Sequence, residues 1–253
     1  MRFYLGGYSA DLNVAWLDPA DGSIEIVGKV TTPENASFVR YVPELSVLYA
    51  TVESGYRTGE AGKIAAYRVD VSGRLTAIGS TESCGPRPCH GAVDPERRLL
   101  AAANYGGENW VAIRINDDGT FAGEAACVRH TGSSVNPARQ AEPHPHATTF
   151  SPDGDYIFVC DLGTDEVVRY TTADVAGGSP KGEPAAKARP GAGPRHFEFS
   201  DDGRFAYLVT EMGNTIVVYA YDVGNGSLDK LQELSTLPDS FDGESTAAEV
   251  QLH

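Results

Sequence analysis

The sequence lacks the features of a membrane protein. No apolar run approaches the roughly 20 residues of a membrane span. The first residues, MRFYLGGYSADLN, contain no apolar segment long enough for a signal peptide. These absences predict a soluble, cytoplasmic protein that has no membrane partner.

Cysteine is also scarce, with 4 residues in a chain of 253. None of the four, Cys84, Cys89, Cys127 and Cys160, stands in a C-x-x-C spacing. Cys160 lies in an apolar segment and is expected to pack as a small hydrophobe. Cys84 and Cys89 bracket the residues GPRP, and a disulfide between them is the alternative to reduced thiols, which are the default expectation in the cytoplasm.

Basic residues are few. Lys and Arg number 20 against 35 Asp and Glu, so the formal net charge is −15. A field of this sign repels nucleic-acid phosphates and anionic membranes, so we expect no nucleic-acid partner. An anionic ligand would have to be held by a locally basic site.

Helical patterning is nearly absent, and short β-branched and aromatic runs alternate with turn signals such as PDG and DDG. Four segments begin alike: ASFVRYVPELSVLYATVE, PCHGAVDPERRLLAAANYG, HPHATTFSPDGDYIFVCDLG and PRHFEFSDDGRFAYLVTEMG. Their matching positions, Phe38, His90, Ala147 and His196, are 52, 57 and 49 residues apart. A third strand follows each, and a recognisable fourth follows in all but the third repeat, where residues 175–191 are a Gly/Pro/Ala-rich excursion.

Units of four strands and about 50 residues predict an all-β fold, a β-propeller of four-stranded blades. We expect one domain over residues 1–253, with repeats at about 35–83, 84–140, 141–190 and 191–246. A fifth blade would be split between residues 1–34 and 247–253, so that pairing of the chain ends removes both free edges. The alternative is a truncated propeller whose missing blades lie beyond His253. An open ring would favour a dimer through its blade edges, and a closed one a monomer.

Polar residues recur where each first strand starts and where each second strand ends. In a propeller these positions face a shared cup, so residues distant in sequence converge there. The starts supply His90, His144, His146, Arg195, His196 and, in the last fragment, Glu249. The ends supply Glu53, Asn104, Asp161 and Glu211.

His146 is the candidate general acid or base, because histidine titrates near neutral pH. The alternative is a strand-entry residue hydrogen-bonded to a neighbouring blade. An H-x-H segment offers two metal ligands, but no third His or Cys accompanies it, so we expect no metal.

Gly-Pro-Arg occurs twice, ending at Arg87 and at Arg195. We expect the two motifs to lie in equivalent loops, and both arginines are candidate bidentate anchors for a carboxylate or phosphate, the alternative being surface ion pairs. Glu211 ends an apolar strand, where desolvation would raise its pKa, unless it only pairs with Arg195. The long polar loop before His144 adds the donor Arg139. No nucleophile elbow and no nucleotide-binding glycine pattern is present, so we expect no cofactor.

The segments HTGSSVNPARQAEPHPHATTFSPDGDYIFVCDLGTD, GPRHFEFSDDGRFAYLVTE and LSTLPDSFDGESTAAEV resemble the propeller lactonases typified by bacterial 6-phosphogluconolactonase. That family includes the fungal carboxymuconate cyclase, and its members are longer, seven-bladed propellers. The resemblance covers essentially the whole chain and is strongest from Pro88 to Val250. It implies site roles for His146, Arg195 and Glu211, with a second arginine beyond His253. The family tends to Asn-Glu where this chain has Thr210–Glu211.

The resemblance implies hydrolysis of a small anionic sugar δ-lactone, most specifically of 6-phosphogluconolactone to 6-phosphogluconate in the pentose phosphate pathway. His146 or Glu211 would take a proton from the attacking water, and Arg195 would stabilise the oxyanion or hold an anionic group. The predicted substrate-binding residues around them are His144, His196, His90, Arg87, Asn104, Arg139, Asp161 and Glu249. Two alternatives remain: a catalytically silent propeller that binds a metabolite or protein on its channel face, and a calcium-dependent lactonase of another propeller type.

Overall fold

The computed structural model describes residues 1–32, 35–55 and 58–252. It divides into two compact units, Met1–Gly107 with Val111–Ala125 and Glu108–Trp110 with Ala126–His253, which are described separately. The boundary falls within the third of five sheets.

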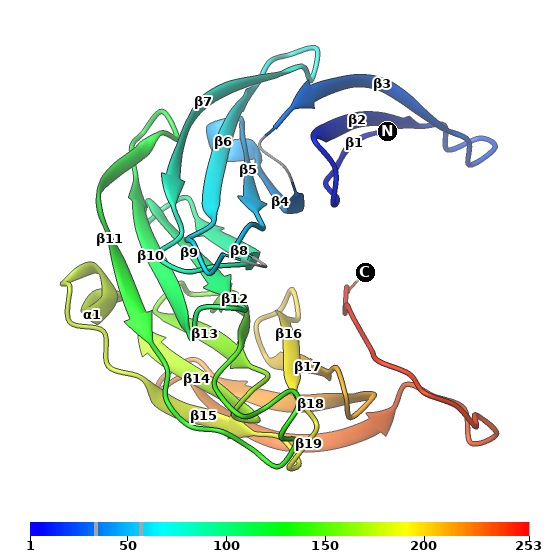
Figure 1. Cartoon of the computed structure of the whole chain (residues 1–253), viewed down its shortest axis with the longest axis vertical. Coiled ribbons are helices and arrows are strands. Elements are labelled where there is room, and N and C mark those ends of the chain that lie inside the picture. The colour runs from blue at the N-terminus through cyan, green and yellow to red at the C-terminus, as the bar shows by residue number, and fades with distance from the viewer. Residues whose placement is uncertain (33–34, 56–57, 253) are drawn as a thin grey trace. The chain divides into compact units, whose positions relative to one another are not determined.

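The regular secondary structure of the described chain is almost entirely β-strand (Figure 1). The first sheet has the order β1-β2-β3, with β1 at Arg2–Leu5, β2 at Asp11–Leu17 and β3 at Ile24–Thr31. The second contains β4 (Ala36–Val42), β5 (Val47–Val52), β6 (Lys63–Val69) and β7 (Leu75–Glu82), with a 3-10 turn, η1, at Pro43–Leu45. The third contains β8 (Pro88–Asp94), β9 (Leu99–Asn104), β10 (Asn109–Ile115) and β11 (Phe121–Arg129).

The last two sheets lie in the second unit. The fourth sheet contains β12 (Pro145–Phe150), β13 (Tyr156–Asp161), β14 (Glu166–Thr171) and β15 (Glu183–Lys187), with the short helix α1 at Thr172–Ala176. The fifth contains β16 (Pro194–Phe199), β17 (Phe205–Thr210), β18 (Thr215–Asp222) and β19 (Ser227–Ser235). Neighbouring strands of both sheets pair antiparallel, in sequence order. Each four-stranded sheet lies within one predicted repeat, so the predicted all-β, repeated architecture is confirmed.

Burial changes systematically across a sheet. The second strands β5 and β9 are buried at every residue, and β13 at all but its first. The fourth strand β7 is mostly exposed. A strand covered on both faces reads as a continuous apolar run, which explains sequences such as YIFVC. The second strand therefore carries its last residue, such as Asp161, into a buried position.

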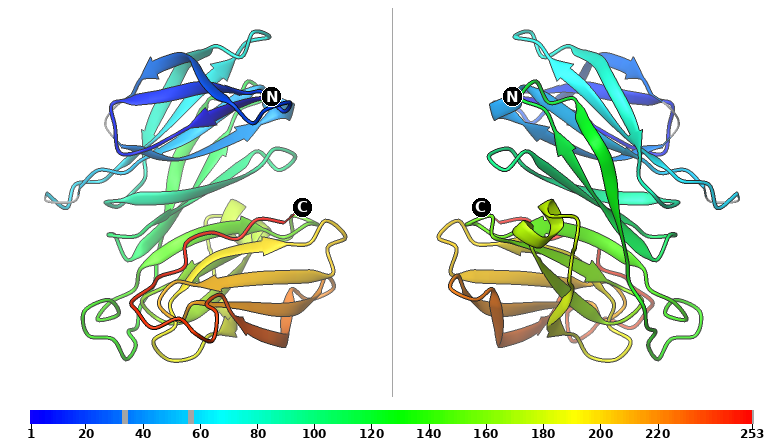
Figure 2. Two further views of the ribbon diagram at one scale, coloured as in Figure 1. Left: turned by 90° about the vertical axis from the view of Figure 1, so that its right-hand side faces the viewer. Right: turned by 90° about the vertical axis from the view of Figure 1, so that its left-hand side faces the viewer.

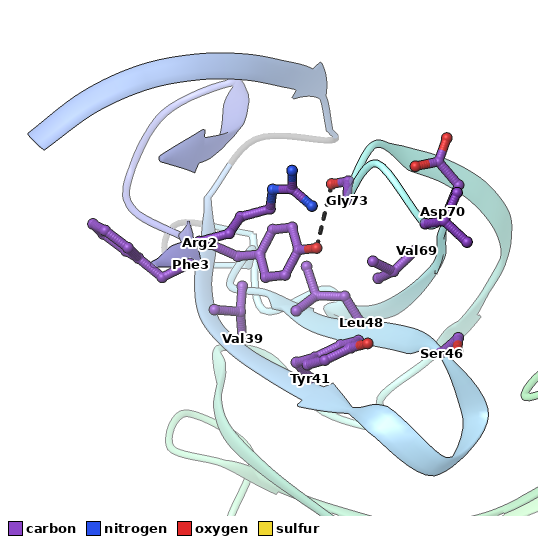
Figure 3. Close-up of a pocket in the computed structure, with 11 residues that line it drawn as sticks. Arg2, Phe3, Val39, Tyr41, Ser46, Leu48, Val69, Asp70 and Gly73 are labelled. Atoms are coloured by element: carbon purple, nitrogen blue, oxygen red, sulfur yellow. Dashed lines mark hydrogen bonds between the residues drawn. The ribbon is translucent and has the colours of Figure 1, made fainter. Parts of the chain in front are cut away.

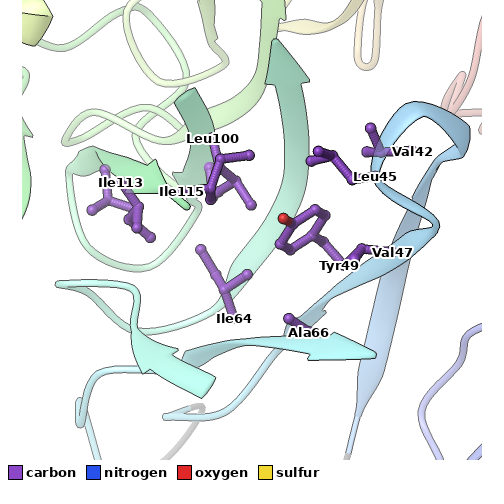
Figure 4. Close-up of a cluster of buried hydrophobic side chains, with 11 residues drawn as sticks. Val42, Leu45, Val47, Tyr49, Ile64, Ala66, Leu100, Ile113 and Ile115 are labelled. Atoms are coloured by element: carbon purple, nitrogen blue, oxygen red, sulfur yellow. The ribbon is translucent and has the colours of Figure 1, made fainter. Parts of the chain in front are cut away.

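Each unit has its own apolar core. In the first unit, Tyr49, Ile64, Leu100 and Ile113 pack in one cluster with aliphatic neighbours (Figure 4). In the second unit, the core is aromatic: the ring of Phe158 stacks on Phe197 with centroids 5.4 Å apart. These contacts join β13 to β16 and so hold neighbouring sheets of the second unit together.

The segment after β19 forms no strand in its described part, residues 236–252, yet it is bound to the fifth sheet (Figure 2). The Asn214 side chain donates to the Ser245 carbonyl at 2.8 Å, and the Ala247 amide donates to the Glu211 carbonyl at 3.0 Å. The split blade of residues 1–34 and 247–253 stays a prediction, as does the single domain.

Two expectations are corrected. The excursion in the third repeat contains a fourth strand, because residues 183–187 pair with β14 despite their Pro and Ala content. Cys84 and Cys127 are disulfide-bonded, whereas Cys89 and Cys160 are free, so Cys84 does not pair with Cys89 and the thiols are not all reduced. In the described part of the chain, no helix has the length and apolar character needed to cross a bilayer.

Candidate functional site

The first strand of every four-stranded sheet contains a bulge at the same place. The register shifts between Ala36 and Phe38, Pro88 and His90, Pro145 and Ala147, and Pro194 and His196. The residues left without a partner across the strand pair are Ser37, Cys89, His146 and Arg195. Bulges redirect a side chain and are common beside active sites. His146 and Arg195 are therefore structurally equivalent residues of neighbouring sheets.

The two equivalent side chains meet at Glu211, which follows the end of β17. Arg195 Nε donates to Glu211 Oε2 at 2.9 Å, and His146 Nε2 lies 3.9 Å from the same oxygen. Arg139, from the loop that precedes β12, donates to Glu211 Oε1 at 2.7 Å. Glu211 is 9% exposed, so its carboxylate is held between two guanidinium groups in a nearly buried position. We call Arg139, His146, Arg195 and Glu211 the Glu211 cluster.

The imidazole of His146 is neutral near pH 7. Burial lowers the pKa of its imidazole well below the ordinary value of 6.5, and the positive charges of Arg195, His196 and Arg139 lower it further. His146 is 8% exposed, and its ring centroid lies 5.3 Å from that of His196. A neutral imidazole beside a carboxylate can accept a proton from water.

His196 joins the C-terminal segment to this cluster. Its Nδ1 lies 2.9 Å from Glu249 Oε1, and Arg195 donates to the Ala248 carbonyl. Burial, the largest single cause, raises the pKa of Glu249, but the hydrogen bond and charge of His196 and hydrogen bonds from Val250 and Gln251 together lower it below the ordinary 4.5. Residues 248 and 249 therefore lie directly beside the Glu211 cluster.

Asp161, the last residue of β13, contacts His144, which directly precedes β12. Asp161 is fully buried, and its Oδ1 accepts hydrogen bonds from the backbone amides of His144 at 2.8 Å and Gly163 at 2.9 Å. Its Oδ2 lies 2.6 Å from Nδ1 of His130. This carboxylate fixes the backbone two residues before His146.

The remaining predicted residues, His90, Arg87 and Asn104, lie in the first unit. Arg87 Nε is 3.9 Å from Glu53 Oε1, and its guanidinium stacks over Tyr105. Asn104 is fully buried and its amide donates to the Ser83 carbonyl, while the His90 ring packs 4.3 Å from Phe38.

The two Gly-Pro-Arg motifs are not equivalent, contrary to expectation. Arg195 is the bulge residue of its strand, whereas Arg87 stands two residues before the bulge residue Cys89. The two identical motifs therefore occupy different positions in their repeats. Glu53 directly follows a second strand, as Glu211 does. It accepts a hydrogen bond from the Tyr8 hydroxyl at 3.0 Å and lies 3.9 Å from Arg87 Nε.

A cavity of about 590 Å³ lies elsewhere in the first unit (Figure 3). Tyr4, Tyr41, Leu48 and Val69 line it, and Tyr4 donates to the Gly73 carbonyl at 3.3 Å. None of the predicted site residues lines this cavity. Among the described residues, no group of three or more His, Cys, Asp or Glu side chains is placed to hold a metal ion.

Comparisons with known proteins agree with one another. Residues 2–253 match the family described as "Lactonase, 7-bladed beta-propeller". A 6-phosphogluconolactonase of Bacillus subtilis is 30% identical over 219 residues, which are 86% of this chain and 60% of that protein. A 6-phosphogluconolactonase of Formosa agariphila is 30% identical over 207 residues, 81% of this chain and 58% of its own length.

A solved structure shows the same similarity. The periplasmic gluconolactonase of Pseudomonas aeruginosa superposes with a TM-score of 0.89 at 32% identity, over all of this chain and 72% of that one. This chain thus spans about 60% of the length of the two 6-phosphogluconolactonases that it matches. The five sheets correspond to blades of a propeller that has seven in the family. The chain belongs to the family of seven-bladed β-propeller lactonases.

Proposed function

We propose that this chain carries the catalytic centre of a lactone hydrolase, with the Glu211 cluster as that centre. The observation that supports it is the Glu211 carboxylate held by Arg139 and Arg195 beside the neutral, buried imidazole of His146. Ester hydrolysis is accelerated by a base for water and by hydrogen-bond donors or positive charge at the oxyanion, and this cluster contains a base and cationic donors.

His146 takes the proton of a water molecule as the water oxygen attacks the ring carbonyl carbon. The carbonyl oxygen becomes an oxyanion, which the guanidinium of Arg195 or Arg139 stabilises. The ring C–O bond then breaks, and the protonated His146 returns its proton to the departing ring oxygen. The product is an open-chain hydroxy acid, whose carboxyl group ionises. Glu211 orients the two arginines and restrains the imidazole.

The proposed substrate is a sugar δ-lactone, and specifically 6-phosphogluconolactone. The names of the Bacillus and Formosa relatives support the phosphorylated substrate, and that of the Pseudomonas relative supports the unphosphorylated one. The two arginines supply guanidinium groups in a chain of net charge −15, and guanidinium geometry suits a carboxylate or phosphate of an anionic substrate. The pentose phosphate pathway and the monomeric or dimeric state remain predictions.

The compartment is part of the proposal. A cytoplasmic location was expected, but disulfide-bonded Cys84 and Cys127 favour an oxidising compartment. The periplasmic gluconolactonase of Pseudomonas aeruginosa provides a precedent in the family. An unphosphorylated gluconolactone is the substrate to test first if the protein is found outside the cytoplasm.

The test is hydrolysis of glucono-δ-lactone and of its 6-phosphate, each corrected for spontaneous ring opening. We expect Arg195→Gln to lower kcat/KM by about 100-fold or more, the usual effect of removing an oxyanion donor. Arg204→Gln is the matched control, because Arg204 is an exposed arginine that pairs with Asp202 in the β16–β17 turn. We expect it to retain kcat/KM within about twofold of the starting protein, as surface ion pairs contribute little.

The proposal would be overturned if the starting protein hydrolysed neither lactone faster than the spontaneous reaction in buffer. Equal activity of Arg195→Gln and Arg204→Gln would overturn the assigned centre. Binding of a lactone or its acid without turnover would instead support the silent, metabolite-binding alternative.

A further inference from the structure

Asp165 is a buried carboxylate in the turn between β13 and β14. It is fully buried and has a positive φ of 60°. We propose that Asp165 is the positioning residue that fixes Arg139 and Arg195 at the separation needed to hold Glu211. This inference rests on the proposed function and adds a residue that does not touch the Glu211 cluster.

One pair of contacts ties Asp165 to the loop that carries Arg139. Gln140 Nε2 donates to Asp165 Oδ1 at 2.9 Å, and the Ser134 hydroxyl donates to Oδ2 at 2.5 Å. Gln140 is itself fully buried, and its Nε2 also donates to the Leu162 carbonyl at 2.9 Å. Since Gln140 is the neighbour of Arg139 in the chain, its position sets where the Arg139 backbone lies.

A second pair of contacts ties Asp165 to the loop that carries Arg195. The Gly193 amide donates to Oδ1 and the Gly191 amide to Oδ2, both at 2.7 Å. The Ala188 amide donates to the Asp165 carbonyl at 2.8 Å. Gly193 is two residues before Arg195, so this contact sets where β16 begins.

The charge of Asp165 is stabilised by these donors. No ion pair to it is found in the described part of the chain, and each carboxylate oxygen accepts two hydrogen bonds. A buried carboxylate is costly unless such bonds are made. The two loops that bind Asp165 therefore strongly prefer the one geometry in which all four hydrogen bonds are made.

Only a carboxylate can accept from all four donors. An asparagine would place an NH₂ group on one side. In place of Oδ2, this group could donate to the Ser134 hydroxyl, but the Gly191 amide would lose its acceptor. In place of Oδ1, it would leave both the Gln140 side chain and the Gly193 amide without their acceptor. The loss is expected to shift the loop before Arg195, and a displacement of about 1 Å at a catalytic group can cost on the order of 100-fold in rate.

The test compares Asp165→Asn with Val217→Ala. Val217 is 2% exposed in the apolar core of the same unit, and its side chain has no polar atom that could tie it to either loop. Its truncation therefore reports general destabilisation. We expect Asp165→Asn to lower kcat by about 10-fold or more at a temperature well below its Tm. We expect Val217→Ala to lower Tm while keeping kcat within about twofold.

Coupling gives a readout that a purely structural role would not produce. If Asp165 acts through Arg195, adding Asp165→Asn to Arg195→Gln should lower kcat/KM by less than the product of the single effects. Multiplicative effects in the double variant would overturn the inference, as would unchanged kcat in folded Asp165→Asn.

A structural readout keeps this inference separate from the proposed function. In a crystal structure of Asp165→Asn, we expect the contact of Arg195 or Arg139 with Glu211 to be lost. Retention of both contacts would overturn the positioning role, whether or not the starting protein hydrolyses lactones. Absence of lactone hydrolysis in the starting protein would overturn only the proposed function.

Discussion

At the scale of single residues, one backbone position takes different side chains in successive sheets. The bulge residue is Ser37, Cys89, His146 and Arg195 in turn. The bulge supplies the direction of the side chain, and the residue type supplies the chemistry. A base and a cation therefore reach one carboxylate from equivalent positions, with no special loop needed for either.

Part of this cluster was predictable from the sequence. His146, Arg195 and Glu211 stand at strand ends that the repeat alignment identifies. The contact of Arg139 was not predictable, because it comes from an irregular loop whose path depends on buried contacts such as those of Asp165. The bulges were also invisible in the sequence, since a register shift depends on pairing across strands.

The lowered pKa of His146 predicts a pH effect on stability. The unfolded chain binds a proton at His146 near the ordinary pKa of 6.5, and the folded chain does so only at lower pH. The unfolded state therefore binds more protons below pH 6.5, and stability falls as the pH drops toward the folded pKa, by at most about 1.4 kcal/mol per pH unit.

Chemical denaturation between pH 7.5 and 5 measures this effect, with His146→Gln as the reference that cannot titrate. We expect the free energy of unfolding of the starting protein to fall more steeply below pH 6.5 than that of the variant. Parallel curves would show that His146 does not have a lowered pKa.

At the scale of elements, the repeat period made the strands predictable. Second strands are continuous apolar runs because they are covered on both faces, and the turns that precede them recur every 49 to 57 residues. Strand β15 was missed because its residues, EPAAK, have low intrinsic β propensity. Pairing with β14 stabilises this strand, and a propensity argument does not include that contact.

Gly193 makes the connection into β16 sensitive to substitution. Its φ is +68°, and an added Cβ would lie 2.8 Å from Met212 Cε and 3.0 Å from Leu162 Cγ. We expect Gly193→Ala to displace Arg195 and to lower kcat/KM of lactone hydrolysis by about 10-fold. Its free energy of unfolding should also fall, by more than the roughly 1 kcal/mol that an alanine costs in the left-handed conformation.

Gly178→Ala is the matched control for this substitution. Gly178 has a φ of +74° but no atom within 4 Å of an added Cβ, so it shares the backbone cost without the steric one. Thermal unfolding and lactone hydrolysis should be followed for both variants. Similar effects on kcat/KM would show that the packing around Gly193 does not position Arg195.

At the scale of the whole molecule, the cysteines fall into two classes. Cys84 and Cys127 are disulfide-bonded, and the free thiol of Cys160 is fully buried, which raises its pKa above the ordinary 9.0. The sequence could not assign these states, because the spacing of four cysteines does not determine which are close in space.

Thiol titration in denaturant therefore has a defined expected result. Protein unfolded without reductant should show two reactive thiols per chain, and reduced protein four. Reduction should also lower Tm, since a disulfide typically contributes about 2–4 kcal/mol. Four thiols before reduction would contradict the disulfide and restore the cytoplasmic expectation.

The position of Glu211 has a consequence for the end of a catalytic cycle. Lactone hydrolysis creates a new carboxylate, the very group that Arg139 and Arg195 already bind in Glu211. The protein's own carboxylate thus competes internally with the product for the same two cations. Such competition weakens retention of the acid, so on the proposed function this arrangement accelerates product release as well as ring opening.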